Sequence, residues 1–174
     1  MLNGAARVAT WVVRILQFIF AVILVGICSY MIHQYREGGF KVPNEVILPE
    51  SASVIAMVIT LFSLAAVFFL GRTLQFVAVF FDFVIWLLYL ASVGLLRHNF
   101  HPHREDNPLW RSLVFVKLAQ REDPHRHLQA GLVRLLVALV VIQIFFFFFT
   151  LLLSAFVATR LEENRTRRRT THAV

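Results

Sequence analysis

The sequence is poor in cysteine and in charge. Its 174 residues include one cysteine, Cys28, so it has no disulfide framework and no Cys-x-x-Cys redox or metal pair. This excludes the disulfide-exchange enzymes of the bilayer. Charged residues make up only 16% of the chain, whereas a soluble domain has about 25%. The sequence is therefore not that of a typical soluble protein.

Catalytic motifs are also missing from the sequence. It contains no nucleotide-binding loop, His-Glu-x-x-His motif, nucleophile elbow or pair of intramembrane histidines for haem. We therefore expect a protein that is not an enzyme and has no cofactor. The net charge is +7, but the arginines lie in loops and tails beside apolar runs and do not alternate with aromatic residues. This pattern indicates no nucleic-acid partner.

Long apolar runs dominate what remains. Apolar residues make up 59% of the chain, and a soluble protein of this length cannot bury four separate runs of about 20 residues. We predict membrane spans at about 11–32, 53–70, 74–96 and 131–158. The first is too long for the core of a signal peptide, which has about 7–15 residues. The predicted fold class is all-α.

The predicted architecture is a four-transmembrane-helix membrane bundle with a long polar loop between helices 3 and 4. Residues 33–50, with Gly38, Gly39 and Pro43, separate the first two spans, and Gly71 to Thr73 form the tight turn between the next two. The long loop covers 97–129. One four-span membrane domain, 1–160, is then followed by a basic tail, 161–174.

Lys and Arg near the span ends set the orientation of a membrane protein. Their numbers on the two sides are nearly equal, but the loop cations are diluted by acids. The tail instead concentrates cations that we expect to contact anionic lipids: Arg165, Arg167, Arg168 and Arg169. We therefore predict that both termini are cytoplasmic. Thr170 and Thr171 each have an arginine three residues upstream, so phosphorylation there is chemically plausible, although an unmodified topology signal is the favoured interpretation.

Two spans carry motifs that resemble a known family. In the first span, Arg14 and Gln17 form an Arg-x-x-Gln step, and in the third Asp82 precedes Trp86 by four residues. Both resemble fungal MARVEL-type tetraspan membrane proteins, over roughly residues 7 to 160. The long histidine-bearing loop departs from the compact pattern of that family.

The resemblance implies cytoplasmic termini, a four-helix bundle and no active site. It also implies a role in membrane organisation or vesicle trafficking, at the plasma membrane or on endomembrane vesicles. The expected partners are membrane lipids and either copies of the chain or other membrane proteins. The alternative function is a small transporter or channel subunit built around Asp82.

Asp82 is the one acid inside the predicted spans, and a carboxylate at the centre of a span costs about 3 kcal/mol to insert. Counting the helical rise from the span ends brings Gln17 and Gln143 to a similar depth. We predict an intramembrane polar cluster of these three residues, either a proton or substrate relay or, as we favour, interhelical hydrogen bonding. Helical side chains lean toward the N-terminus, so we expect Arg14 to extend to the headgroups and not to Asp82.

The long loop holds two further candidates. Five histidines flank it and are possible zinc or copper ligands, although polar filler or weak pH sensing fits their unspecific spacing better: His98, His101, His103, His125 and His127. Between them, Leu109, Leu113 and Leu118 recur at helical spacing. This predicts a short helix, either in the membrane interface with Trp110 as its anchor or packed on the bundle.

Overall fold

The computed structural model of the chain describes residues 2–69, 72–100, 107–120 and 126–171, with side chains described within 8–64, 77, 79–100, 107–120 and 127–154. In this part of the chain every regular element is helical. The elements are α1 (Leu2–Glu37), α2 (Asn44–Phe69), α3 (Arg72–Leu96), the short 3₁₀ helix η1 (Arg97–Asn99), α4 (Pro108–Ala119) and α5 (Arg126–Thr171). The predicted all-α fold class is confirmed.

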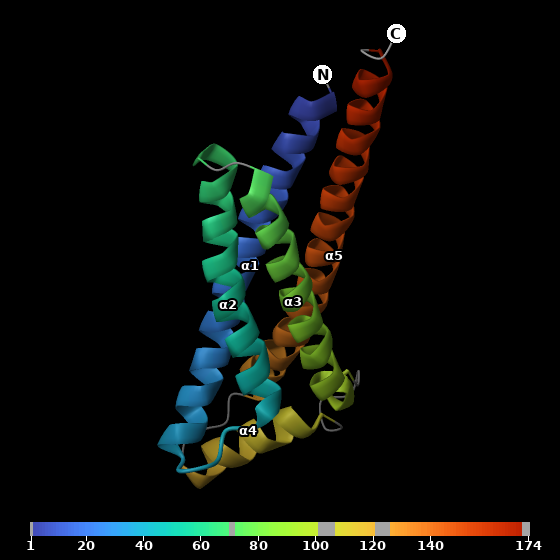
Figure 1. Cartoon of the computed structure of the whole chain (residues 1–174). Helices are drawn as coiled ribbons and strands as arrows, with labels where there is room; N and C mark the ends of the chain where they lie inside the picture. The colour runs from blue at the N-terminus through green and yellow to red at the C-terminus, as the bar shows by residue number, and fades with distance from the viewer. Residues whose placement is uncertain (1, 70–71, 101–106, 121–125, 172–174) are drawn as a thin grey trace.

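Four of these helices are long and apolar enough to cross a membrane. The candidate spans among the described residues are Val8–Glu37, Asn44–Leu64, Val79–Asn99 and His127–Ser154. Figure 1 shows α1, α2, α3 and α5 running lengthwise, with both chain termini at one end and α4 lying across the other. We call these the terminal end and the loop end of the bundle. The chain is an integral, multi-pass membrane protein.

The spans pack through a stripe of buried residues that repeats every three and four positions. In α1 the stripe runs Arg14, Gln17, Ala21, Leu24, Cys28, Met31 and Tyr35, and in α5 it runs Val133, Leu136, Val140, Gln143, Phe147 and Thr150. Alternating steps of three and four keep one face of a slightly tilted helix against its neighbour, as in coiled coils. In α2, Ala52 and Ala56 are small and fully buried, which lets helix backbones approach closely.

The first connection is shorter than the polar stretch predicted at 33–50. Helix α1 continues to Glu37 and α2 begins at Asn44. The helices are broken only by Gly38, Gly39 and Pro43, which lie between them. Gly39 has a φ of 71°, a conformation that side chains disfavour and that ends a helix. Glu45 and Glu50 therefore fall inside α2, and the expectation of a single acid within the spans was wrong.

Helix α4 confirms the short helix predicted in the long loop, and it packs on the bundle. Asn99 Oδ1 accepts a hydrogen bond from the backbone N–H of Leu109, with an N···O distance of 2.9 Å, and Ser112 hydrogen-bonds the Tyr35 hydroxyl. Trp110 packs against the buried core. Trp110 is only partly buried, so its predicted role as a membrane anchor stays a prediction.

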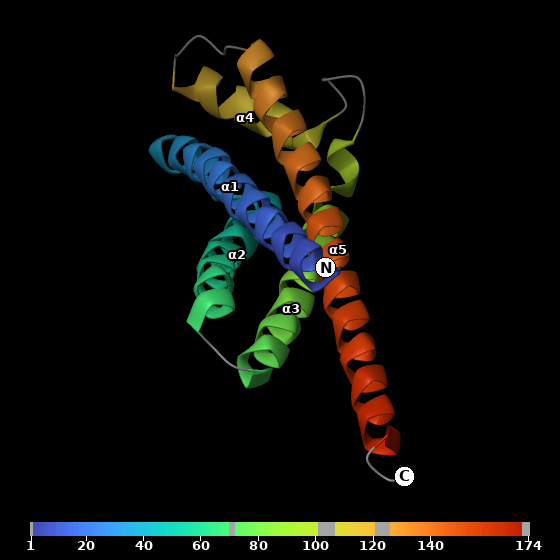
Figure 2. The same cartoon turned by 90° about the horizontal axis from the view of Figure 1, so that it is seen from above.

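The last helix reaches well past the others. With 46 residues, α5 is about 69 Å long at the standard rise of 1.5 Å per residue. Its terminal part continues beyond the ends of α2 and α3, as the view from above shows (Figure 2). The helical backbone therefore runs through the segment predicted as a basic tail, up to Thr171.

Candidate functional site

The candidate site is a polar network buried between α1, α3 and α5 near the terminal end. Its members occupy the same three-and-four stripes that hold the apolar core, so helix geometry alone turns them inward. Gln17, Asp82, Gln143 and Thr150 are each fully buried, and Arg14 is almost so. We call these five residues the intramembrane network.

An ion pair between Arg14 and Asp82 forms its centre. Arg14 Nη1 donates to Asp82 Oδ1 at 2.6 Å, and Arg14 Nη2 donates to Asp82 Oδ2. The planar guanidinium thus meets the carboxylate with two parallel hydrogen bonds, the strongest geometry available to this pair. It joins α1 to α3 across 68 positions of sequence.

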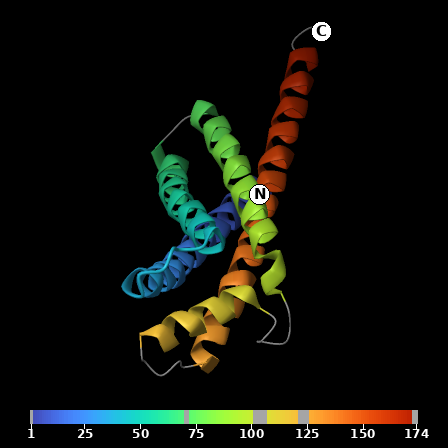
Figure 3. The same cartoon turned by 90° about the horizontal axis from the view of Figure 1, so that it is seen from below.

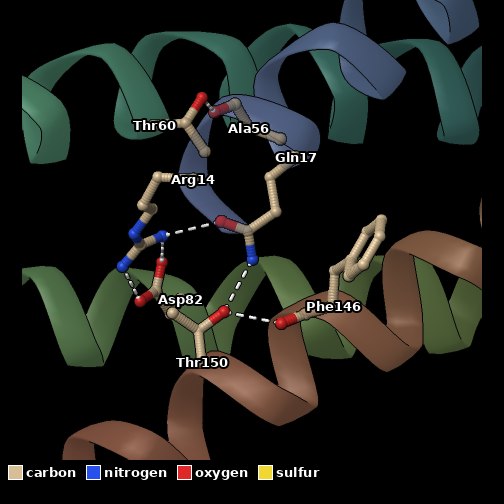
Figure 4. Close-up of polar contacts among 7 residues, drawn as sticks. All are labelled: Arg14, Gln17, Ala56, Thr60, Asp82, Phe146 and Thr150. Carbon is tan, nitrogen blue, oxygen red and sulfur yellow. Dashed lines mark hydrogen bonds and ion pairs between the residues drawn. The ribbon is translucent and has the colours of Figure 1, made fainter. Parts of the chain in front are cut away.

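Gln17 connects this pair to α5. Its Oε1 accepts from Arg14 Nη1 at 3.2 Å, and its Nε2 donates to Thr150 Oγ1 at 2.7 Å. Gln143 Nε2 donates to the backbone oxygen of Gln17 at 2.8 Å. Figure 4 shows the chain of contacts from Asp82 through Arg14 and Gln17 to Thr150. Three helices are therefore held by one continuous set of hydrogen bonds.

The structure brings the three predicted members of the polar cluster together, but through a residue that was expected elsewhere. Asp82 and Gln17 both bind Arg14, and Gln143 reaches the main chain of Gln17. The expectation that Arg14 extends to the headgroups was wrong. An unpaired Asp82 carboxylate among apolar side chains would cost free energy. This cost is larger than the preference of the Arg14 side chain to point toward the N-terminus of its helix.

Two members of the network, Arg14 and Thr150, were not predicted, although their spacing from predicted members indicates both of them. Arg14 precedes Gln17 by three residues and Thr150 follows Gln143 by seven, so each lies on the same helix face as a predicted member. The depth of a residue along a span identifies its level only. The face of the helix decides whether it meets a partner at that level.

The two charges of the network are paired with each other, while two of its buried polar atoms, Arg14 Nε and Gln143 Oε1, have no hydrogen-bond partner among the described residues. Both oxygens of the Asp82 carboxylate accept from Arg14, and the hydroxyl of Thr150 donates to the Phe146 carbonyl oxygen at 2.6 Å. Thr60 lies beside the network in Figure 4, but its hydroxyl donates to the Ala56 carbonyl oxygen of its own helix at 2.7 Å. This arrangement is suited to joining helices, since each charge meets its opposite.

Further polar pairs lie toward the loop end. Tyr89 and Ser53 join α3 to α2 with a hydroxyl–hydroxyl distance of 3.1 Å, and Gln129 Nε2 donates to Gln34 Oε1, from α5 to α1, at 3.3 Å. All four residues are buried. Together with the intramembrane network, they place polar contacts between the helices along the length of the bundle.

The loop histidines form no metal site in the part of the chain that the structure describes. His98 and His127 are exposed, and His98 Nε2 accepts a hydrogen bond from Arg97 Nε at 2.9 Å. No group of three or more His, Cys, Asp or Glu among the described residues could hold a metal ion. His101, His103 and His125 lie outside the described residues.

The predicted tail sites lie on the final turns of α5. The backbone of this segment is helical up to Thr171, but the side chains of the four tail arginines and of Thr170 and Thr171 lie outside the described residues. Their predicted lipid contact and phosphorylation therefore stay predictions.

Comparison with known proteins gives one match. A family model described as MARVEL, membrane-associating domain, matches residues 7–152. This range includes the first three candidate spans in full, the fourth almost to its end at Ser154, and every member of the intramembrane network. No curated protein and no solved structure matches the chain.

Proposed function

Because the chain belongs to the MARVEL family of membrane-associating domains, we propose that it is a non-enzymatic scaffold that organises lateral membrane domains or vesicle carriers. Such a protein acts through its outer surface, by the lipids and the membrane proteins that it gathers. Its interior needs only to hold the helices in one arrangement.

One observation carries the proposal: the spans turn their strongest polar groups inward and their large apolar groups outward. The Arg14–Asp82 pair is enclosed, while Val58 on α2, Phe80 on α3 and Phe145 on α5 are each more than 60% exposed. Charges that face the interior of a bundle and pair with each other can join its helices and need no solute between them. An apolar surface on several sides suits lipids and neighbouring membrane proteins.

A fluorescent fusion and cross-linking in native membranes test this function. We expect the fusion to concentrate in discrete membrane patches or vesicles, and cross-linking to join the chain to copies of itself or to other membrane proteins. An even distribution over the membrane, with no cross-linked product at any reagent concentration, would contradict the scaffold.

The transporter alternative needs a different variant from the obvious one. Asp82→Asn alone leaves the Arg14 guanidinium buried without its counter-charge, so a loss of activity would not separate transport from misfolding. The double variant Arg14→Gln, Asp82→Asn removes both charges and keeps hydrogen-bonding groups. If liposomes with the wild-type protein conduct protons or small cations, and this folded double variant does not, the scaffold function fails.

The basic tail is proposed to bind anionic lipids on the cytoplasmic side. Each cation near such a surface contributes about 1 kcal/mol, and a phosphate that adds about −1.5 to −2 charges would cancel much of this. We expect Glu at both Thr170 and Thr171 to weaken binding of the 155–174 segment to anionic vesicles at physiological salt, and Gln at both to leave it unchanged. Equal binding of the two variants would leave the arginines with an orienting role alone.

A further inference from the structure

Helix α4 has apolar residues on two faces, and only one of them is covered. Leu109, Leu113 and Val116 are buried against the bundle, whereas Phe115 is 61% exposed and Leu118 is 53% exposed. A loop helix in water normally carries polar residues on its outer face. The second face therefore needs a partner.

The attachment of α4 fixes its level relative to the spans. It is hydrogen-bonded to Asn99 and Tyr35, which lie in the last turns of the candidate spans Val79–Asn99 and Val8–Glu37. Helix α4 is thus level with the ends of the spans, and not a layer beyond them. A bilayer that covers these spans comes up to α4.

The position of α4 at the edge of the bundle gives lipid access to it. Figure 2 and Figure 3 show α4 beside the ends of α1 and α5, toward the periphery and not under the centre of the bundle. Other large apolar side chains are exposed at this end, Phe100 after α3 and Leu128 at the start of α5. The exposed apolar surface of the spans therefore continues to the level of α4.

Cations accompany the exposed aromatic ring. Arg111 lies one turn before Phe115 and is exposed on the same face, and Lys41 is exposed next to Phe40, whose ring meets that of Phe115 edge-on at 5.7 Å between centroids. Aromatic rings with neighbouring Lys and Arg are typical of the boundary between acyl chains and phosphates.

We propose that α4 is an interfacial lipid-binding helix, which inserts Phe115 and Leu118 between the headgroups and acyl chains of the leaflet at the loop end. Arg111 and Lys41 lie at the depth of the lipid phosphates. The bilayer itself, and not a second protein, then covers the free face of α4. This site is independent of the scaffold function, since it concerns how the chain sits in its own membrane.

Fluorescence quenching in reconstituted liposomes tests this site. Single cysteines replace Phe115, Leu118, Lys41 or Val58 in a Cys28→Ala background, and each carries the same environment-sensitive dye. Val58 is 64% exposed, like Phe115, but lies inside a candidate span, so it marks full lipid contact. Lys41 marks the water-facing side of the interface. Brominated lipids and aqueous iodide are the two quenchers.

We expect the dyes at positions 115 and 118 to be quenched by lipids brominated near the headgroup and protected from iodide, compared with the dye at Lys41. Circular dichroism of each variant establishes that it is folded. Iodide quenching at position 115 equal to that at position 41, with no quenching by brominated lipid, would overturn the proposal. The face would then be open to water and available to a protein partner.

Discussion

The Arg14–Asp82 pair makes the most decisive test of this structure, because removing one partner and removing both should have opposite consequences. Breaking a buried ion pair from one side costs about 3–5 kcal/mol, since the remaining charge is buried without compensation. Replacing both partners with apolar residues of similar volume is often neutral or stabilising. We therefore expect Arg14→Met and Asp82→Leu each to lower the free energy of unfolding by about 3–5 kcal/mol.

The double variant should regain most of that loss. What it does not regain is the hydrogen bond from Arg14 to Gln17, which has an N···O distance of 3.2 Å and is of a kind worth about 0.6 kcal/mol between helices in membranes. The coupling energy, which is the difference between the loss of the double variant and the sum of the two single losses, should then have a magnitude of about 5–9 kcal/mol, above the range of about 0.5–3 kcal/mol found for most contacting pairs.

Equilibrium unfolding in mixed detergent micelles with increasing dodecyl sulfate, followed by tryptophan fluorescence, measures these free energies. Thr60→Val is the matched control: Thr60 lies beside the network, but its hydroxyl is bonded within α2, so its effect should add to that of Asp82→Leu. Additive losses for Arg14→Met and Asp82→Leu would refute the buried pair and return Arg14 to the headgroups.

Three further outcomes follow from other parts of the chain. A side chain at Gly38 would place its Cβ 2.9 Å from Val116 Cγ1 on α4. We therefore expect Gly38→Val to loosen α4 and to speed proteolysis of the long loop. Equal rates of digestion for the wild-type protein and the variant would contradict this contact. Gln17→Leu removes the side-chain hydrogen bond to Thr150 on α5, worth about 0.6 kcal/mol, and leaves the backbone oxygen that Gln143 binds, so it should lower the unfolding midpoint modestly; a loss as large as that of the ion pair would show that Gln17 has another role. With Cys28→Ala, a cysteine at Ala173 should resist an impermeant thiol reagent in intact cells, and ready labelling would place the termini outside.

Much of the fold could be predicted from the sequence because lipid leaves a hydrophobic helix few alternatives. Within a bilayer every backbone polar group must be satisfied inside the segment, so long apolar runs become helices whatever their neighbours. The four spans follow from this, and the helix within the long loop follows from the helical spacing of its leucines. The ends of the spans were less predictable. Helix α2 includes Pro49 and Glu50, since the break depends on the turn at Gly39 and not on where polar residues begin.

The intramembrane network shows where local reasoning ends. The sequence by itself determines that Gln17, Asp82 and Gln143 lie in the spans at similar depths, because depth follows from the helical rise. Which of them touch, and that Arg14 turns inward to Asp82, depends on how α1, α3 and α5 rotate and pack against each other. That rotation is a property of the whole set of buried stripes. Only the tertiary structure decides this rotation, since two opposite charges attract each other strongly only when packing brings the two helix faces that carry them into contact.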